Sequence, residues 1–503
     1  MKYRFRTTPY AHQKVALRQL IAQQYGGALL MEPRTGKTKT AIDWLAILVQ
    51  AGKLDRAVIV CPARVMSTWL EEIHTHCPVR VHVTVWDKDA RAGGLRPPPS
   101  GYDLSLLVVN YEAFATPGRV LPSGRRSKTS GRFKHRALIL KWMQGKPAAL
   151  IVDESHKIES PSGKAANMIV SLQRSFPYRL ILTGTPITKA KRAFDIYMQW
   201  NFLNPDRFAD LPTFADFKDR YGRWTNKNGY PQFVGPRNLK QLHQRISKDS
   251  VIVRRDECFD LPPREDIVRY VELTPRTRSL YVQLAEEMIA EIEEGVYGEA
   301  SIKLVQNLRL AQLTSGFMMD TEHVFHRISF EKLEALQELV EDAIEEDQRL
   351  VVVARWKADL DAIEELGRSL DMPVYSIRGG IKRSIADEGR RSFQARDEAS
   401  LMVLQPAAAS LGIDLASAST MVWYSHTPSW VDFSQACDRI ALSRTSTTFY
   451  HLIAKKSVDE ILLDVLHQDG DVGKAILTNP RELLEGHKLP LDRFNRLKGL
   501  GIL

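Results

Sequence analysis

The amino-acid sequence predicts an α/β protein made of two parallel-sheet lobes in tandem, with helical insertions between them. Short apolar runs rich in Val, Ile and Leu alternate with segments of helical period, and this alternation appears in each half of the chain. With 503 residues, the chain is also too long for a single hydrophobic core. Both observations favour two lobes in which helices cover a buried sheet.

The apolar runs have the length and composition of buried strands. The expected strands are residues 27–31, 57–61, 104–110, 148–154 and 178–186 in the first half, and 349–354, 373–377, 401–405, 420–424 and 449–454 in the second. Between them lie segments of helical period. One of these, residues 331–347, has an apolar stripe of the kind that a helix lying on a sheet requires, formed by Leu333, Leu336, Val340, Ala343 and Ile344.

The connection between the lobes is expected at the paired prolines of residues 260–266. We therefore expect residues 1–262 to form the first lobe and residues 263–470 to form the second. The remaining residues, 471–503, are expected to form a C-terminal tail or brace.

The segment between the two sets of strands differs from the rest of the chain. Residues 190–330 are rich in helical pattern and aromatic side chains. They predict a helical protrusion from about residue 190 and a helical insertion at about residues 275–325. Two turn-rich stretches, residues 91–101 and 117–136, are expected to be surface loops.

The composition narrows the class of protein. Lys and Arg number 70 against 60 Asp and Glu, and the resulting charge of +10 suits a polyanionic partner. The cysteines lack the spacing of a zinc site or a disulfide framework, so we expect no zinc and reduced thiols at Cys61, Cys77, Cys258 and Cys437. No apolar stretch is long enough to span a bilayer, and the N-terminus lacks the apolar region of a secretory signal. A cytoplasmic protein without a membrane partner is expected.

A candidate phosphate loop follows the first expected strand. The sequence MEPRTGKTKT at residues 31–40 stands between that strand and a helical segment, which is the context of a P-loop. It predicts binding of ATP and Mg²⁺. Lys37 would reach the β and γ phosphates, and Thr38 would offer a hydroxyl to magnesium. Met31 replaces the first glycine of the usual pattern, so a basic turn is the alternative. The expected cofactor-binding residues here are Glu32, Pro33, Arg34, Thr35, Gly36, Lys37 and Thr38.

A candidate acidic site ends another expected strand. In ALIVDESHK, an apolar run ends in Asp153 and Glu154, where the carboxyl edge of a parallel sheet meets its ligand. Asp153 would share magnesium with Thr38, and Glu154 would polarise the attacking water. The alternative is that both carboxylates cap the following helix.

Together these motifs resemble superfamily II helicases, and within them the Swi/Snf-like DNA translocase ATPases. The likeness covers roughly residues 8–460. It implies two RecA-like lobes, ATP hydrolysis and DNA as the partner. The similar stretches, in the family's order, are PYAHQ, VIVCPARVMSTWLEEI, VVNYEAF, DESH, LTGTPI, WNFLNPDRF, VIVRRDECFDLPP, GIKRSIADEGRRSFQ, AAASLGIDLASAS and SWVDFSQACDRI.

The resemblance also implies roles for single residues, some with open alternatives. Gln13 would read the adenine edge. Thr183 and Thr185 would link the ATP and DNA sites, or form only a Gly-Pro turn. His156 would relay the hydrolysis state, or be a histidine with satisfied hydrogen bonds at a helix start. The residues expected to face nucleic acid are Arg64, Ser67, Tyr111, Thr183 and Thr185, with a plain helix cap as the alternative for Ser67.

The second half carries the expected arginine finger, the arginine that stabilises charge on the transferred phosphate. Gln435 and Arg439 are four residues apart, which predicts one helical face. Arg439 is the first candidate, with a solvated arginine as the alternative. Leu442 stands where the family has a second arginine, and Arg444 is a substitute for it, so the identity of the finger stays open.

The later motif AAASLGIDL is expected to contact the nucleotide through Gly412 and Asp414. This stretch also departs from the family. Ala409 and Ser410 stand where relatives have glycines, which mildly stiffens the backbone.

The function expected from these features is an ATP-dependent DNA motor that tracks along duplex DNA, or unwinds or remodels branched DNA. The compact arrangement resembles phage or bacterial members, which act in replication, recombination or repair in the cytoplasm of a bacterium or infected host. The basic stretch GRRSKTSGRFKHR would touch the duplex or be a solvated loop. Two alternatives are a nucleotide-gated scaffold without hydrolysis, suggested by Leu442, and an RNA-directed helicase. Protein partners are not predicted.

Overall fold

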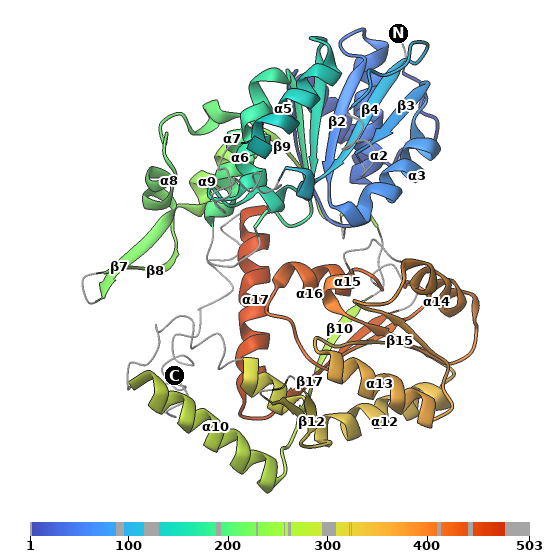
Figure 1. The fold of residues 1–503 in the computed structure, drawn as a ribbon, viewed down its shortest axis with the longest axis vertical. Helices are drawn as coiled ribbons and strands as arrows, with labels where there is room; N and C mark the ends of the chain where they lie inside the picture. Colours follow the sequence, from blue (N-terminus) through green and yellow to red (C-terminus); the bar gives the residue numbers. More distant parts are fainter. Residues whose placement is uncertain are drawn as a thin grey trace, which may run out of the picture. The chain divides into compact units, whose positions relative to one another are not determined.

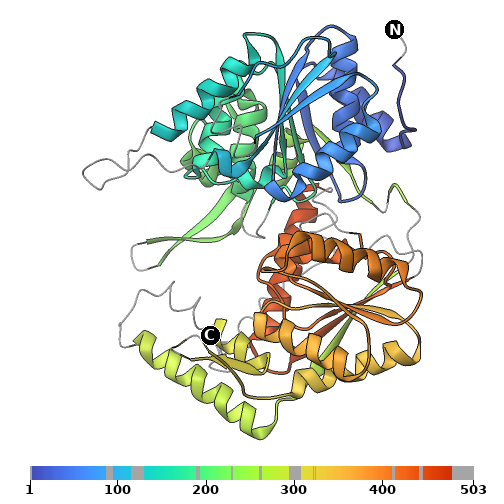
Figure 2. The ribbon, with the colours of Figure 1, turned by 45° about the vertical axis from the view of Figure 1, so that its right-hand side comes forward.

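The computed structural model confirms the α/β class and the two parallel sheets. It describes residues 3–86, 95–114, 130–187, 193–227, 230–255, 257–259, 263–293, 308–320, 322, 324–409, 414–440 and 446–477. The chain divides into two compact units, and the division in the predicted connection falls between Asp260 and Leu261, two residues before the predicted boundary. Residues 471–477, near the C-terminus, group with the first unit. Each unit has its own RecA-like sheet with helices packed on it (Figures 1 and 2).

The first unit is built on a seven-stranded sheet with the order β3-β4-β2-β5-β6-β1-β9, and all neighbouring strands are parallel. The strands are β1 (Gly26–Met31), β2 (Arg56–Cys61), β3 (Val81–Val85), β4 (Leu104–Asn110), β5 (Ala148–Asp153), β6 (Tyr178–Thr183) and β9 (Ser250–Val253). The helices are α1 (Ala11–Ala22), α2 (Lys37–Gln50), α3 (Met66–His76), α5 (Ser130–Met143), α6 (Lys164–Leu172) and α7 (Ile196–Leu203).

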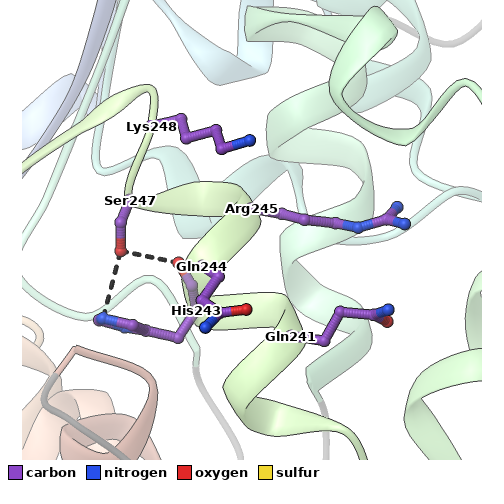
Figure 3. A pocket seen from close by; sticks show the side chains of 6 residues that line it. All are labelled: Gln241, His243, Gln244, Arg245, Ser247 and Lys248. Carbon is purple, nitrogen blue, oxygen red and sulfur yellow. Dashed lines mark hydrogen bonds between the residues drawn. The ribbon is translucent and has the colours of Figure 1, made fainter.

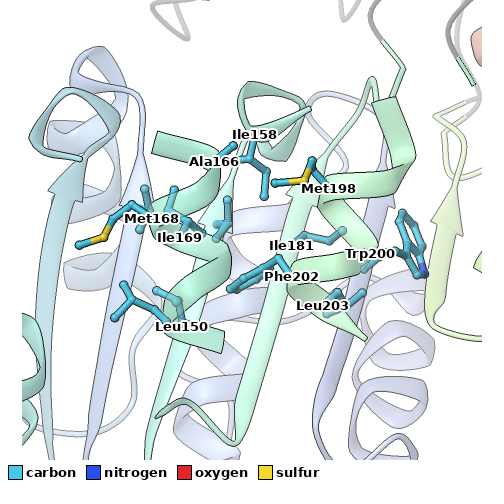
Figure 4. Packing of buried hydrophobic residues seen from close by; sticks show 14 of the residues in the cluster. Leu150, Ile158, Ala166, Met168, Ile169, Ile181, Met198, Trp200, Phe202 and Leu203 are labelled. Atoms are coloured by element: carbon cyan, nitrogen blue, oxygen red, sulfur yellow. The ribbon is translucent and has the colours of Figure 1, made fainter. Parts of the chain in front are cut away.

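The central strands of this sheet are buried on both faces. In β5, Leu150 and Val152 pack into one hydrophobic cluster, while Ala149 and Ile151 pack into the cluster on the other face. Figure 4 shows the first cluster where α6 and α7 lie against the sheet. Burial on both faces explains why the sequence of β5 is a continuous apolar run instead of an alternating one.

The protrusion expected from about residue 190 contains helices, but it also contains a β-hairpin that the sequence analysis missed. The helices are α7, α8 (Phe214–Tyr221) and α9 (Leu239–Ile246), and between the last two lies the antiparallel pair β7 (Gly222–Lys227) and β8 (Tyr230–Pro236). The signal for the hairpin was the dipeptide Asn228-Gly229, a favoured two-residue hairpin turn. After α9 the chain returns to the sheet as β9, which pairs with β1.

The second unit is built on a six-stranded parallel sheet with the order β10-β17-β16-β13-β15-β14. Its strands are β10 (Arg264–Val271), β13 (Arg349–Val353), β14 (Val374–Ile377), β15 (Ser400–Leu404), β16 (Thr420–Trp423) and β17 (Thr447–Ala454). Its helices are α10 (Pro275–Glu293), α12 (Glu331–Glu345), α13 (Lys357–Ser369), α14 (Arg383–Ala395), α15 (Pro406–Ala409), α16 (Trp430–Cys437) and α17 (Val458–Leu477). The insertion expected at about 275–325 holds α10 and a short antiparallel pair, β11 (Phe317–Met319) and β12 (Phe325–Arg327).

Several local predictions were wrong. The stripe of α12 includes the buried Leu339, which was not predicted, while Ile344 is 36% exposed. Residues 130–136, expected in a loop, begin α5, and residues 115–129 lie outside the described part of the chain. The predicted tail at residue 471 begins inside α17, because that helix continues to Leu477.

The sequence predicts reduced cysteines, no zinc site and no segment that spans a membrane. Among the described residues, the cysteines are free, and Cys61, Cys77 and Cys437 are buried. Across the same ranges, no three His, Cys, Asp or Glu side chains gather in a way that would hold a metal ion. Nor does any helix within them have the length and apolarity needed to cross a membrane.

A buried carboxylate secures the point where the protrusion rejoins the sheet. Asp249, just before β9, is inaccessible to solvent. Arg207 donates to both of its oxygens at 2.7 and 2.5 Å, and Trp200 Nε1 donates at 3.0 Å. Tyr25 and Asn204 donate to it as well. Burial by itself would raise the pKa of Asp249, but the hydrogen bonds from Arg207 and Tyr25 outweigh burial and hold the pKa below its usual value.

We expect Asp249→Ala to lower the free energy of unfolding by about 3 kcal/mol, because Arg207 and the buried donors lose their partner. Chemical denaturation of the full chain measures this loss. The matched control is Asp210→Ala, which removes the more exposed pair with Arg245 and should cost about 1 kcal/mol or less. Equal losses in the two variants would contradict the assignment.

The same carboxylate predicts a dependence of stability on acid. The pKa of Asp249 is lower in the folded chain than in the unfolded chain, where Asp titrates near about 3.9. The stabilisation that charged Asp249 contributes to the fold is therefore complete above about pH 4. It is lost as the pH falls through the pKa that Asp249 has in the folded chain. Unfolding free energies measured from pH 6 down to pH 3 should fall less steeply for Asp249→Asn than for the wild type.

Candidate nucleotide site in the first unit

The loop between β1 and α2 has the geometry of a phosphate-binding loop. Gly36 has a φ of +82°, and a Cβ atom at this position would lie 2.0 Å from Nε2 of Gln13, so only glycine fits. Lys37 begins α2, and its Nζ donates to the carbonyl of Met31 at 2.7 Å. The first helical turn also carries Thr38, which is half-buried. A basic turn without a ligand would not need this tight strand–loop–helix geometry.

Helix α1 holds this loop from one side. Gln13 is buried, and its Oε1 accepts from the amide of Tyr10 at 2.9 Å. Its Nε2 lies 3.4 Å from the carbonyls of Thr35 and Gly36, and His12 Nε2 lies 2.8 Å from the Thr35 carbonyl. The amide of Gln13 therefore faces the loop, and its contact with adenine stays a prediction.

Other loop residues are used to build the loop itself. Thr35 is buried and donates through its hydroxyl to the carbonyl of Glu32 at 2.7 Å. The carboxylate of Glu32 accepts from the amide of Arg255 at 2.9 Å, which ties the loop to the segment after β9. Arg34 has a φ of +65°, an uncommon conformation for a residue with a side chain. Nucleotide contacts by Glu32, Pro33, Arg34 and Thr35 stay predictions.

The acidic site lies at the carboxyl end of β5. Asp153 is buried, and its oxygens accept from Trp69 Nε1 at 2.8 Å and from the amide of Glu154 at 2.9 Å. Burial raises the pKa of Asp153 to about 7, and the charge of Glu154 adds to this, while Trp69 and Lys37 lower it. The influence of Lys37 indicates that the structure brings the predicted lysine and aspartate together.

The residues present fit a magnesium–nucleotide. Burial favours the neutral form of Asp153, so a cation beside the carboxylate would stabilise its charged form. Lys37, in the phosphate loop, donates to the carbonyl of Met31. Thr38 and Asp153 would hold the ion. The capping alternative fails for Glu154, which precedes a 3-10 turn (Ser155–Ile158) without a capping hydrogen bond from its side chain.

A series of close polar contacts runs from the acidic site to the TGTP loop. Nδ1 of His156 lies 3.3 Å from Glu154 Oε2 and 3.4 Å from the hydroxyl of Thr183. That hydroxyl accepts from the amide of Thr185 at 3.0 Å. Because one ring nitrogen makes both contacts, His156 lies beside the acid and the threonine, and its role as a relay stays a prediction.

The TGTP loop also packs directly on the phosphate loop. A Cβ atom added to Gly184 would lie 2.9 Å from Cδ of Pro33 and 3.2 Å from the carbonyl of Met31. The two loops therefore touch at a glycine. A plain Gly-Pro turn does not require this contact, so the linking role expected for Thr183 and Thr185 gains support.

Some residues expected to face nucleic acid have other surroundings. Tyr111 is buried, and its hydroxyl donates to the carbonyl of Asp153 at 2.5 Å, so it supports the strand end and offers no surface to DNA. Thr183 is fully buried and is excluded from a direct contact. Ser67 lies inside α3, whose N-cap is Val65, so the cap alternative is wrong. The side chain of Arg64 lies outside the described residues.

In the second unit, Gln435 and Arg439 were predicted to share one helical face, but the helix ends between them. Helix α16 ends at Cys437, so Arg439 lies in the turn beyond it, buried, with Nε donating to the carbonyl of Gln435 at 2.9 Å. The prediction that both residues share one helical face is wrong for this reason, as is the alternative of a solvated arginine. Asp414 is exposed, and its Oδ1 accepts from the amide of Ala416. Gly412, Leu442 and Arg444 lie outside the described residues.

Sequence reasoning missed two residues of this site. Trp69 supplies the indole N–H that holds Asp153, and Gly184 allows the two loops to touch. Trp69 stands in the quoted stretch VIVCPARVMSTWLEEI, but nothing in the sequence distinguishes an indole that meets a carboxylate from one in the core. For Gly184, the sequence indicated the Gly-Pro turn but not that this turn packs against Pro33 and Met31 of the phosphate loop.

A parallel sheet with a phosphate loop after β1 and a buried acid after β5 defines a P-loop nucleotide-binding protein. The particular family follows from comparison with known proteins. The SNF2-related domain matches residues 12–316, and the helicase conserved C-terminal domain matches residues 331–442. The first match alone spans more than half of the chain, so the chain belongs to the family of proteins with an SNF2-related domain.

Individual relatives are distant in sequence. Over 97% of its length, the chain is 23% identical to the ISWI chromatin-remodeling complex ATPase ISW1 of Saccharomyces cerevisiae, of which it covers 42%. Over 88% of its length, it is 24% identical to the SWI/SNF-related matrix-associated actin-dependent regulator of chromatin subfamily A-like protein 1 of Xenopus laevis, of which it covers 41%. The chain thus spans about two fifths of these relatives.

Among solved structures, the chain is similar to the Sulfolobus solfataricus SWI2/SNF2 ATPase core in complex with dsDNA. The sequence identity is 19%, the match covers 98% of this chain and 99% of that chain, and the TM-score is 0.40.

We expect Gly184→Ala to weaken nucleotide binding about tenfold, because the added methyl group forces the TGTP loop and the phosphate loop apart. Titration with a fluorescent ATP analogue measures the change. Gly389→Ala is the matched control, since its Cβ would make an ordinary contact of 3.6 Å with Tyr375. Unchanged affinity in Gly184→Ala would show that the two loops do not need this contact.

Proposed function

We propose that this protein is an ATP-dependent motor that moves along DNA or remodels it. The observation that carries the proposal is the joining of Lys37, Asp153 and the Glu154–His156–Thr183 contacts at one sheet edge. The SNF2-related domain and the helicase C-terminal domain support ATP use on DNA. The relatives named above are a chromatin-remodeling ATPase and a regulator of chromatin, which agrees with remodelling.

Each residue of the first unit has a role in this proposal. Lys37 and the main-chain amides of the loop bind the phosphates, and Thr38 and Asp153 hold magnesium, which supplies charge neutralisation when bound. Glu154 orients the attacking water and accepts its proton at a carboxylate oxygen. His156 and Thr183 carry the change at Glu154 to the TGTP loop. Arg439 and Arg444 are the proposed finger arginines.

The nucleic-acid partner is proposed to be duplex or branched DNA, gripped through its phosphates. A motor that tracks along DNA must ignore sequence, and phosphate contacts carry no sequence information. Binding should therefore weaken steeply with salt. The relatives named above come from yeast and Xenopus, and they do not support the phage or bacterial setting expected from the sequence.

Leu442 is the observation that favours a second candidate, a nucleotide-gated DNA-binding scaffold that does not hydrolyse ATP. An ATPase measurement with and without DNA separates the two. Turnover that rises with DNA eliminates the scaffold, whereas binding of both ligands without turnover eliminates the motor. RNA of matched length, added in the same assay, tests whether the enzyme is RNA-directed instead.

We expect Lys37→Ala to lose nucleotide binding, because the loop loses the lysine that is proposed to bind the phosphates. Glu154→Gln should bind ATP and DNA but hydrolyse ATP on the order of a hundredfold more slowly, because its amide cannot accept the proton. Steady-state ATPase and filter binding distinguish the two variants. Lys53→Ala, an exposed lysine after α2, is the control. Wild-type turnover in Glu154→Gln would remove Glu154 from the chemistry.

Duplex tracking predicts a specific pair of results. With ATP, the protein should displace the third strand of a DNA triplex but should not separate a forked duplex. Both substrates are followed on native gels, with Glu154→Gln as the negative control. Separation of the fork without triplex displacement would replace tracking by unwinding.

A further inference from the structure

Positive charge is concentrated in the segment that carries the hairpin. Residues 214–248 contain eight Lys and Arg side chains against two Asp side chains, a net charge of +6 in a chain whose total is +10. The segment comprises α8, the β7–β8 hairpin and α9. A local excess of this size attracts polyanions irrespective of the charge of the whole protein.

The hairpin is a fixed arm of the first unit. Figures 1 and 2 both show β7 and β8 extending away from the helices of that unit. Its base is held by aromatic packing, since Trp224 stacks on Phe194 at 6.1 Å and meets Phe233 at 5.3 Å. The ammonium group of Lys218 lies 5.6 Å from the Trp224 ring. The arm is therefore positioned before any partner binds, which limits the entropy that binding costs.

One face of the hairpin is polar and basic. Along β7, Arg223, Trp224 and Thr225 are all exposed; Trp224, at 38% exposure, also packs in the aromatic base, and the register of the pair shifts between Arg223 and Trp224. Across the pair, Gln232 lies opposite Thr225 and Gly235 lies opposite Arg223. The missing side chain of Gly235 leaves room for the arginine, because a Cβ atom there would lie 3.2 Å from its guanidinium.

Three cations of the segment, one each from α8, β7 and α9, form no ion pair among the described residues, although the charge of Arg220 also acts on Asp210. Arg220, Arg223 and Lys240 are exposed, and no described carboxylate lies within ion-pair distance of them. In contrast, Arg245 in the same segment donates to both oxygens of Asp210. Arginines and lysines left without a counter-ion on a fixed arm are suited to an external anion.

The basic surface continues along α9 to its C-terminal end. A hollow of about 570 Å³ there is lined by Gln241, His243, Gln244, Arg245, Ser247 and Lys248, without an acidic side chain. Figure 3 shows Gln241, Arg245 and Lys248 extending to the same side, while Ser247 is hydrogen-bonded to His243. The opposite face of α9 is buried through Leu242 and Ile246. Within this lining Arg245 is held by Asp210 and Ser247 by His243, so the donors turned to solvent are those of Lys248 and the two glutamines.

We propose that the polar face of the β7–β8 hairpin and the exposed face of α9 together bind the phosphate backbone of DNA. This proposal rests on the proposed function. Nucleic acid fits the surface better than an acidic protein, because protein interfaces centre on apolar side chains. The exposed side chains here are mainly Arg, Lys, Thr, Asn and Gln, and they outnumber the exposed apolar Trp224 and Val234. The anchored hairpin extends the DNA-binding surface of the first unit beyond its sheet edge.

The test is a triple variant, Arg220→Gln, Arg223→Gln and Lys240→Gln, in the full chain. Binding to a fluorescent 30-base-pair duplex is measured by anisotropy from 25 to 300 mM salt. Each lost phosphate contact should reduce the slope of log K against log salt by about 0.9. Three lost contacts would reduce it by about 2.7, and affinity at low salt should fall about tenfold or more. Thermal unfolding reports whether the variant is folded.

Two further variants make the result specific. Arg220→Lys with Arg223→Lys keeps the charge and should retain the wild-type slope. Lys53→Gln, Lys141→Gln and Arg174→Gln remove the same charge from other exposed positions of the first unit, and should leave the slope nearly unchanged. A slope and affinity in the hairpin variant equal to those of this control would overturn the proposal and leave an acidic protein as the partner of the surface. Failure of the proposed function gives other results: a wrong DNA partner appears as a wild type that does not bind DNA, and a missing motor activity appears as absent ATP turnover with the salt slopes unaffected.

Discussion

The site depends on the fact that all strands of the first sheet run in the same direction. Their carboxyl ends meet at one edge, and the order β5-β6-β1 places β6 between the acidic strand and the strand that leads to the phosphate loop. Thr183, the last residue of β6, pairs with Leu30 in β1, while its neighbour Leu182 pairs with Asp153. The TGTP loop is therefore adjacent to both ligand-binding loops because of strand order. Any path from the acid to the lysine across the sheet passes through it.

The loops at this edge hold residues in unfavourable backbone conformations. Gly36, Arg34 and Glu154 all have positive φ angles, of 82°, 65° and 52°. Glycine adopts this region without cost, whereas the other two residues do so against a penalty on the order of 1 kcal/mol or more. The surrounding hydrogen bonds, such as that from the Glu154 amide to Asp153, maintain these conformations. Of the eight non-glycine residues with positive φ in the described part of the chain, Arg34 and Glu154 lie where phosphate and magnesium are proposed to bind.

The sequence predicted those parts of the structure whose signal is local. Strands buried on both faces, such as β5, were found because they are apolar throughout, in β5 as far as Val152. The edge strands β3 and β10 were missed since they are partly exposed, and β10 begins with the charged residues Arg264, Glu265 and Asp266. The edge strand β9 was missed although it is largely buried, because its apolar run is only three residues long. In the site, Lys37 and Asp153 followed from motifs. Trp69 and the buried position of Tyr111 did not, because they depend on which side chains the fold brings together across the sheet.

The insertion that carries the basic hairpin is also the segment that borders the phosphate loop. From α9 the chain passes through Asp249, whose carbonyl accepts from the amide of Ala28 in β1 at 2.8 Å, into β9. Beyond β9, the amide of Arg255 donates to Glu32 in the phosphate loop. Adjacency alone does not make the two sites coupled, since coupling requires one element whose equilibrium both ligands shift. The Glu32–Arg255 contact joins the chain after β9 to the phosphate loop. It would couple the proposed DNA and ATP sites only if both ligands changed its population.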